Sequence, residues 1–172
     1  MKQTISYSSG NKVSSSDPME RVLGLLQEKA VSVSLEGLSG ASKSKFVVDL
    51  YKFARRPIVV LTKDQNTGES LLGDLQFFAK YNRLKIVPQL FPSWEILPYE
   101  SLSPLSEVTG ERLAILSKMV HGDCHLLIVP VEAAMQYLMP RSVLKNLTYY
   151  VNKGEQVDRE ILEACISDNG FT

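Results

Sequence analysis

The residues best suited to chemistry lie in a glycine- and serine-rich loop between a short β-branched run and a helix-like stretch. The loop, GLSGASKS, runs from Gly37 to Ser44 and is close to the phosphate-binding pattern G-x-x-x-x-G-K-[ST]. In such a loop, backbone N–H groups and the positive end of the helix dipole face a phosphate, and the Lys ammonium closes over it. Gly37, Lys43 and Ser44 occupy the expected positions.

The sixth position of this pattern is changed, because Ser42 stands where glycine is expected. Glycine lets the backbone turn and approach a phosphate without a Cβ in the way. One interpretation is a degenerate site that binds ATP and Mg²⁺ weakly or not at all, formed by Gly37, Gly40, Ser42, Lys43 and Ser44. Another is a turn that only joins strand to helix, with Lys43 in solvent. A third is a small kinase or NTPase whose turnover requires Lys43 and Ser44.

Helix-like and strand-like stretches alternate around this loop. The alternation predicts an α/β domain with a mainly parallel sheet flanked by helices, and the loop after the first strand suggests a P-loop NTPase or helicase-like fold. Ligands of such sheets bind at the carboxyl ends of strands, where we expect loops 37–44, 62–64 and 130–132 to converge. The expected strands are 31–35, 58–61, 84–87, 125–129 and 148–151, and the expected helices are 18–29, 43–54, 66–81, 106–120, 131–138, 140–147 and 158–169.

Two of these elements are predicted in more detail. The run from 58 to 61 is apolar and β-branched throughout, which is typical of a parallel strand that is buried on both faces. In the helix at 106–120, Leu113, Leu116 and Val120 form an apolar stripe, and Arg112 lies outside it.

Composition limits the domain organisation and the class of partner. The 172 residues are 44% hydrophobic and carry no net charge, so the chain can form a core but does not bind nucleic acid by bulk charge. We expect a flexible, serine-rich arm at 1–17, an α/β domain at 18–147, and the truncated start of a second small α/β domain at 148–172. The last two elements are too few to form a core of their own.

The remaining polar candidates favour structural roles. Cys124 and Cys165 fit no ligand spacing, and cysteines without a CxxC pattern or a secretory signal indicate a reducing, cytoplasmic location. His121 and His125 straddle a turn and a strand start, so we predict no metal site. Glu132 is a candidate general base, but a carboxylate also suits the first turn of a helix. No apolar segment is long enough to span a membrane.

A proline-rich segment at 89–104 contains the only Trp. Its apolar residues predict an ordered loop that packs over the end of the sheet. In the alternative interpretation, Trp94 and Tyr99 stack on a DNA base while Arg55 and Arg56 contact phosphates. The lack of net charge makes that DNA-binding interpretation the weaker one.

Six segments carry a family likeness in chain order: GLSGASKS, RRPIVVLTKD, LFPSWEILPYESLSP, GERLAIL, LLIVPVEAAMQYLMP and VNKGEQVDREIL. Together they resemble the N-terminal, UvrB-like region of the bacterial transcription-repair coupling factors (Mfd), over about residues 30–172. The most specific is W-E-x-L-P-Y-[ED]-x-x-S-P, formed here by Trp94, Glu95, Pro98, Tyr99 and Pro104.

The resemblance implies a fold and a role. This part of the family is similar to the excision-repair protein UvrB, which implies a first helicase-like subdomain up to about residue 147 and then the start of a domain that docks UvrA. It implies no catalysis here, because ATP hydrolysis in the family belongs to a DNA translocase module further along the chain. The implied role is a scaffold that links stalled RNA polymerase to nucleotide excision repair and restrains the motor. UvrA would bind mostly through residues beyond this chain, and RNA polymerase and DNA through the rest of the parent protein.

Overall fold

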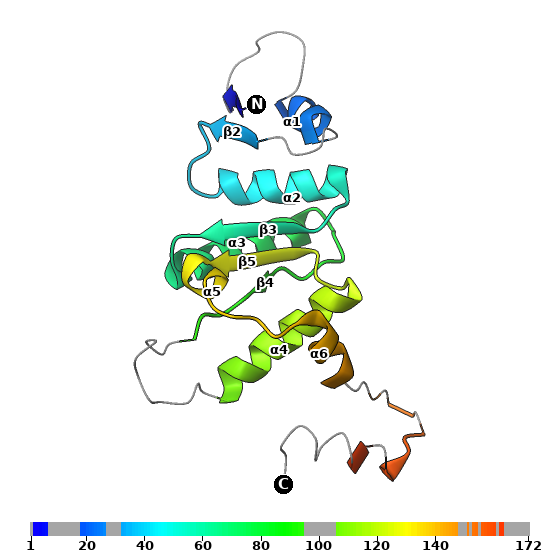
Figure 1. The fold of residues 1–172 in the computed structure, drawn as a ribbon. Coiled ribbons are helices and arrows are strands. Elements are labelled where there is room, and N and C mark those ends of the chain that lie inside the picture. The colour runs from blue at the N-terminus through cyan, green and yellow to red at the C-terminus, as the bar shows by residue number, and fades with distance from the viewer. Residues whose placement is uncertain are drawn as a thin grey trace.

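The computed structural model describes residues 2–6, 18–26, 32–94, 106–147, 151, 153–154, 156–160 and 162–163. Strands and helices alternate along most of this length (Figure 1). In chain order they are β1 (Lys2–Ser6), α1 (Pro18–Leu26), β2 (Ser32–Glu36), α2 (Ser42–Ala54), β3 (Ile58–Thr62), α3 (Gln65–Tyr81), β4 (Gln89–Leu90), α4 (Ser106–His121), β5 (Leu126–Pro130), α5 (Val131–Ala134) and α6 (Arg141–Leu147).

The main sheet has three parallel strands in the order β3-β5-β4. Ile58 to Thr62 pair with Leu126 to Pro130, and Gln89 and Leu90 pair with Leu127 and Ile128. Helices α3 and α4 supply the crossovers that parallel strands require. The α/β class, with a parallel sheet flanked by helices, is therefore confirmed.

Strand β5 lies in the middle of this sheet, and all five of its residues are buried. Leu126 and Ile128 pack into a core with Val48 and Tyr51 of α2 and Leu75 of α3. The alternate residues of β5 point to the opposite face and pack into a second core, formed by Phe91, Ile115, Cys124, Leu127, Val129 and Ala133. Burial on both faces explains the continuous apolar sequence of β5.

The strand before the glycine- and serine-rich loop lies outside this sheet. Strand β2 pairs in parallel with β1 in a separate two-stranded sheet, and α2 lies between the two sheets (Figure 1). The expectation that β2 belongs to the main sheet, as in a P-loop fold, is wrong for these residues. The sequence of β2 gives the reason: its apolar residues Val33 and Leu35 share one face and pack with Met19, Val22 and Phe46 in a third core. Such a strand suits a sheet covered on one side.

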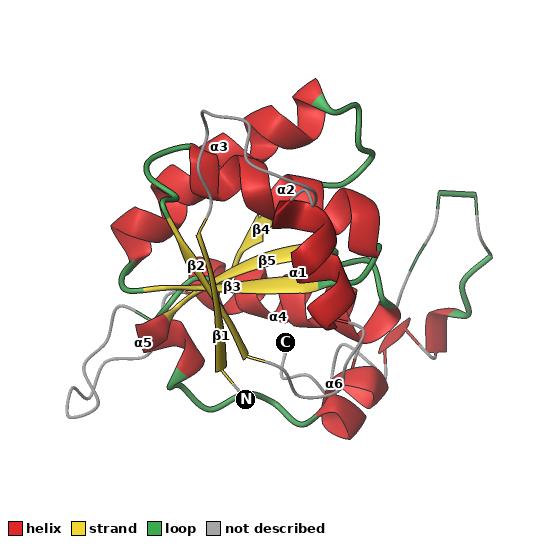
Figure 2. Cartoon of the chain, turned by 90° about the horizontal axis from the view of Figure 1, so that it is seen from above, coloured by secondary structure: helices red, strands yellow, loops and turns green. Residues whose placement is uncertain are grey.

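The first residues also differ from expectation, because Lys2–Ser6 form β1 within the segment expected to be a flexible arm. Ile5 is the only strongly apolar residue of this strand, so the sequence shows no alternation that would reveal it. Figure 2 shows β1 and β2 running side by side and crossing the direction of the main sheet.

Strand β3 is not buried on both faces. Val59 and Leu61 are 57% and 66% exposed, whereas Val60 is half-buried and Thr62 is buried. The exposed residues Val59 and Leu61 lie on the same face as Leu127 and Val129, their partners in β5. β3 is an edge strand, and the core on this face is formed by residues of β5, of α4 and of the segments that follow β4 and β5. The prediction failed because an apolar run does not show whether a neighbour covers it.

The third expected strand is displaced along the chain. Residues 84–88 have no regular structure, and the short β4 follows them. Leu84 N–H donates to Ala79 O (2.9 Å), and Arg83 has a left-handed φ of 53°. This hydrogen bond at the end of α3 keeps Leu84 next to the helix, so a strand does not begin there.

The remaining elements agree with expectation to different extents. The helices expected at 66–81 and 106–120 are confirmed as α3 and α4. The helix expected at 131–138 is only the four-residue α5. Residues 148–150 lie outside the described part of the chain, as does most of the helix expected from 158. No helix of the described part is long and apolar enough to cross a membrane.

Helix α3 offers a paired test of the packing between helix and sheet. An added Cβ at Gly68 would lie 2.9 Å from Leu90 Cδ1 and 3.4 Å from Thr62 Oγ1, whereas one at Gly73 would meet nothing within 4 Å. Gly73→Ala should raise the free energy of unfolding by about 0.5–1 kcal/mol, because it removes backbone freedom from the unfolded chain. Gly68→Ala should gain less or destabilise, because Leu90 must move. Urea denaturation measures both, and equal gains would contradict the close approach of α3 to the sheet.

Candidate functional site

The glycine- and serine-rich loop closes on itself. Gly37 and Gly40 have positive φ angles of 83° and 51°, which glycine adopts at low cost. Ser42 Oγ accepts a hydrogen bond from Ser39 N–H (2.8 Å) and donates one to Ser39 O (2.6 Å). Ser42 N–H also donates to Ser39 O, and Lys43 N–H to Gly40 O. The N–H groups of three loop residues are therefore used within the loop, whereas a phosphate site needs them free.

The residues at the Lys and Ser positions of the phosphate pattern point to different environments. Lys43 is exposed. Ser44 is fully buried, and its hydroxyl donates to Asp74 Oδ2 of α3 at 3.4 Å. The hydroxyl at this position of a complete pattern binds Mg²⁺. Here it lies in the contact between α2 and α3.

The loops expected to converge are each bound to their own helix. In 62–64, Thr62 Oγ1 donates to Asp64 O, and Asp64 Oδ1 accepts from Thr67 N–H at 2.7 Å as the N-cap of α3. Glu132 is exposed in the first turn of α5. Thr62 and Pro130 pair at the carboxyl ends of β3 and β5, but among these described residues no side-chain hydrogen bond or ion pair joins one of the three loops to another. The polar side chains of 37–44, 62–64 and 130–132 therefore do not form one connected cluster.

The other predicted polar residues are also dispersed. Arg55 is the exposed C-cap of α2, with a left-handed φ of 52°. His121 Nδ1 contacts Ser117 O at the end of α4, whereas the His125 ring lies 5.8 Å from that of Tyr51. In the described part of the chain, no three His, Cys, Asp or Glu residues are grouped to hold a metal ion.

Cys124 is buried in the core on the α4 side of the sheet. Burial raises the pKa of its thiol, and Lys118 opposes this only in part. A buried thiol with a raised pKa is a poor nucleophile. Cys165, Glu95, Pro98, Tyr99 and Pro104 lie outside the described residues.

A cluster that the sequence did not predict surrounds Arg112. This residue is only 3% exposed, although it was expected outside the buried face of α4. Its guanidinium carbon lies 4.3 Å from the centre of the Phe91 ring and 4.6 Å from that of Trp94. A planar guanidinium can stack on aromatic rings in this way, and its aliphatic stem can be buried with them.

Hydrogen bonds tie this cluster to the carboxyl ends of two strands. Arg112 Nη1 donates to Pro92 O (2.5 Å), after β4, and to Gln136 Oε1 (2.9 Å), after α5. Gln136 also accepts from Trp94 N–H and donates to Trp94 O. Arg112 Nη2 and Trp94 Nε1 are buried, and neither has a hydrogen-bond partner among the described residues. The cluster thus joins α4 to two loops. No local pattern in the sequence indicated it, because Phe91 and Trp94 belong to a segment that is distant from Arg112 along the chain.

Comparison with known proteins gives a consistent result. No protein-family profile matches the chain. Transcription-repair-coupling factors match it from Myxococcus xanthus (29% identical over 81% of this chain), Escherichia coli (26% over 78%) and Bacillus subtilis (22% over 92%). The chain is a relative of the transcription-repair-coupling factors. It spans only 11–13% of the length of these three relatives.

The capped start of α3 should make stability depend on pH. Hydrogen bonds from Thr67 hold the pKa of Asp64 below its usual value. A lowered pKa in the folded state means that the contribution of Asp64 is complete above about pH 4 and is lost as pH falls through the folded pKa. Asp64→Asn keeps a good N-cap without the titration, so wild type should lose more stability than this variant below pH 4. Urea titrations from pH 6 to about pH 2 measure the difference, and parallel curves would contradict it.

The Arg112 cluster makes a second prediction. Arg112→Lys keeps a buried charge but loses the planar fork and the stacking, so we expect the free energy of unfolding to fall by about 2–3 kcal/mol. Arg112→Met should cost less, because it also removes the buried charge. Urea denaturation followed by circular dichroism measures both, and the fluorescence of Trp94 reports the loss of the cation. Lys80→Met, on the exposed side of α3, is the control. A Lys variant as stable as the Met variant would contradict the role of the fork.

Proposed function

We propose that this chain is a non-catalytic module of a transcription-repair-coupling factor. The observation that carries the proposal is the similarity of 78–92% of the chain to three such factors. In this proposal the module is a scaffold that helps to link a stalled RNA polymerase to nucleotide excision repair and restrains the motor of the parent protein.

The geometry of the loop supports the absence of catalysis. Ser42 uses its hydroxyl to close the loop, and Ser44 directs its hydroxyl to Asp74. A nucleotide would have to break both arrangements before the loop amides and Ser44 met its phosphates and Mg²⁺. We therefore assign ATP-dependent DNA translocation to the rest of the parent protein and not to Lys43 and Ser44.

The proposed partners follow the same division. Residues 18–147 are the UvrB-like helicase subdomain of the proposal, and 148–172 begin the domain that docks UvrA. UvrA is recruited mostly through residues beyond this chain, and RNA polymerase and DNA are bound by other parts of the parent protein. The module alone should therefore bind UvrA weakly.

A chimera tests the proposal in a working protein. The matched region of the Escherichia coli factor is replaced by this chain, and strand-specific repair of a transcribed gene is measured in cells that lack their own factor. We expect the chimera to restore faster repair of the transcribed strand, and Lys43→Ala within it to have no effect. Deletion of the same region is the control.

Two outcomes would contradict this function. A chimera present at the normal level that repairs both strands equally would remove the scaffold role. Repair lost on Lys43→Ala alone would instead favour the enzyme interpretation, in which Lys43 contacts a nucleotide.

A further inference from the structure

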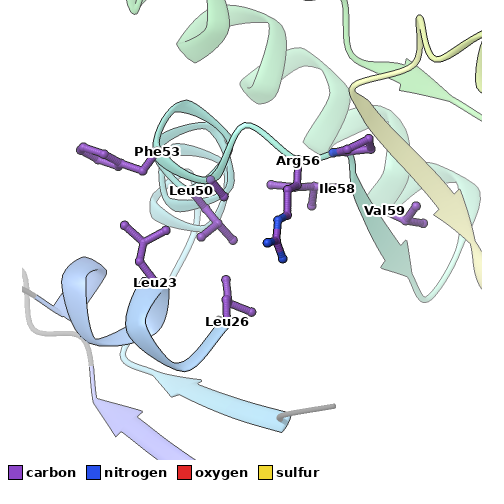
Figure 3. A pocket seen from close by; sticks show the side chains of 9 residues that line it. Leu23, Leu26, Leu50, Phe53, Arg56, Ile58 and Val59 are labelled. Atoms are coloured by element: carbon purple, nitrogen blue, oxygen red, sulfur yellow. The ribbon is translucent and has the colours of Figure 1, made fainter. Parts of the chain in front are cut away.

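An apolar groove of about 510 Å³ lies where three elements meet. Leu23 and Leu26 of α1 form one wall, Leu50 and Phe53 of α2 form another, and the first residues of β3 form the third (Figure 3). This volume is in the range of sites that bind ligands. Phe53 is 59% exposed and Leu26 37%, so the groove presents apolar surface to solvent.

The third wall is an open sheet edge. β3 pairs with β5 on one side and with no other strand of the described chain. Its residue Val59 lines the groove and is 57% exposed. An unpaired parallel strand offers N–H and C=O groups to an added strand, which is a common way for a protein to bind an extended peptide.

The described lining of the groove carries positive charge. Among the described residues that line it, Arg56 is the single charged one, and it points into the space between α1 and β3 in Figure 3. No carboxylate of the described residues pairs with it. Lys52 and Arg55, at the same end of α2, are also exposed. A partner that fills this groove is therefore complementary when it carries a carboxylate close to apolar side chains.

We propose that the groove binds an extended segment of a partner protein, in which apolar side chains alternate along the segment and one acidic side chain pairs with Arg56. The main chain of the segment adds to the open edge of β3. Its apolar side chains cover Val59 and enter the space between Leu26 and Phe53. This inference does not rest on the proposed function, because it uses only the groove, the strand edge and the charge.

Two other occupants fit less well. A long-chain fatty acid would supply a carboxylate and an apolar tail, but it would leave the N–H and C=O groups of β3 unpaired. A second copy would present β3 to β3, and the segment Ile58–Thr62 contains no acidic residue to meet Arg56. An acidic, apolar peptide satisfies all three features of the groove.

Selection from a phage-displayed library of random peptides tests the proposal on the intact chain. Enriched peptides should share alternating apolar residues and one Asp or Glu. Synthetic copies of them should bind about tenfold or more weakly to Val59→Asp, a loss that corresponds to about 1.4 kcal/mol. Arg56→Glu should prefer the same peptides with the acidic residue changed to Lys. Both substituted residues are exposed, so the variants should fold.

Matched controls separate the groove from general surface effects. Val87→Asp replaces a valine before β4 that is also exposed, and Lys80→Glu reverses a charge on α3. Neither should change the affinity. The proposal is overturned if the selected peptides bind Val59→Asp and Arg56→Glu as tightly as the unaltered chain. It is also overturned if oleate displaces them and itself fills the groove, or if the chain forms a dimer that Val59→Asp dissociates.

Discussion

Burial of β5 on both faces is the constraint on which the main sheet depends. A strand with five buried residues needs a covering layer on each side, because every exposed apolar side chain would lose its transfer free energy. Helices α2 and α3 meet this need on one face, and α4 with α5 and the loop after β4 meets it on the other. The edge strand β3 shares this need but receives cover on one face only, which leaves Val59 and Leu61 in solvent.

The Arg112 cluster shows how a charge can hold a packed layer in place. Its guanidinium lies between two aromatic rings and donates to Pro92 O and Gln136 Oε1, which belong to loops at the carboxyl end of the sheet. In the described residues no carboxylate pairs with it, and burial lowers its pKa. Flat stacking and directed hydrogen bonds, and not charge pairing, therefore keep this cation inside. Because Arg supplies both at once, it specifies the path of two loops that have no regular structure.

Sequence patterns predicted those parts of the fold that depend on local periodicity. Helix α3 and strand β5 were found from the spacing of their apolar residues, which lie within a few positions of each other. Sheet membership was predicted wrongly for β2, because its pairing with β1 joins residues that are distant along the chain. For the same reason, the buried side of Arg112 was missed: its partners Phe91 and Trp94 come from another element. At the loop, the sequence identified Ser42 as the altered position. It did not show that the Ser42 hydroxyl would accept a hydrogen bond from Ser39 N–H in the same loop.

Helix α2 belongs to two cores, and this has a consequence for how the molecule opens. Phe46 packs with Met19 and Val22 on the α1 side, whereas Val48 and Tyr51 pack with β5. If β1, α1 and β2 separate as one cooperative unit, α2 still keeps its contacts with the main sheet and remains protected from hydrogen exchange. Such a separation would break the third core but leave the core between α2, α3 and β5 intact, so opening of the β-α-β unit would not require α2 to unfold.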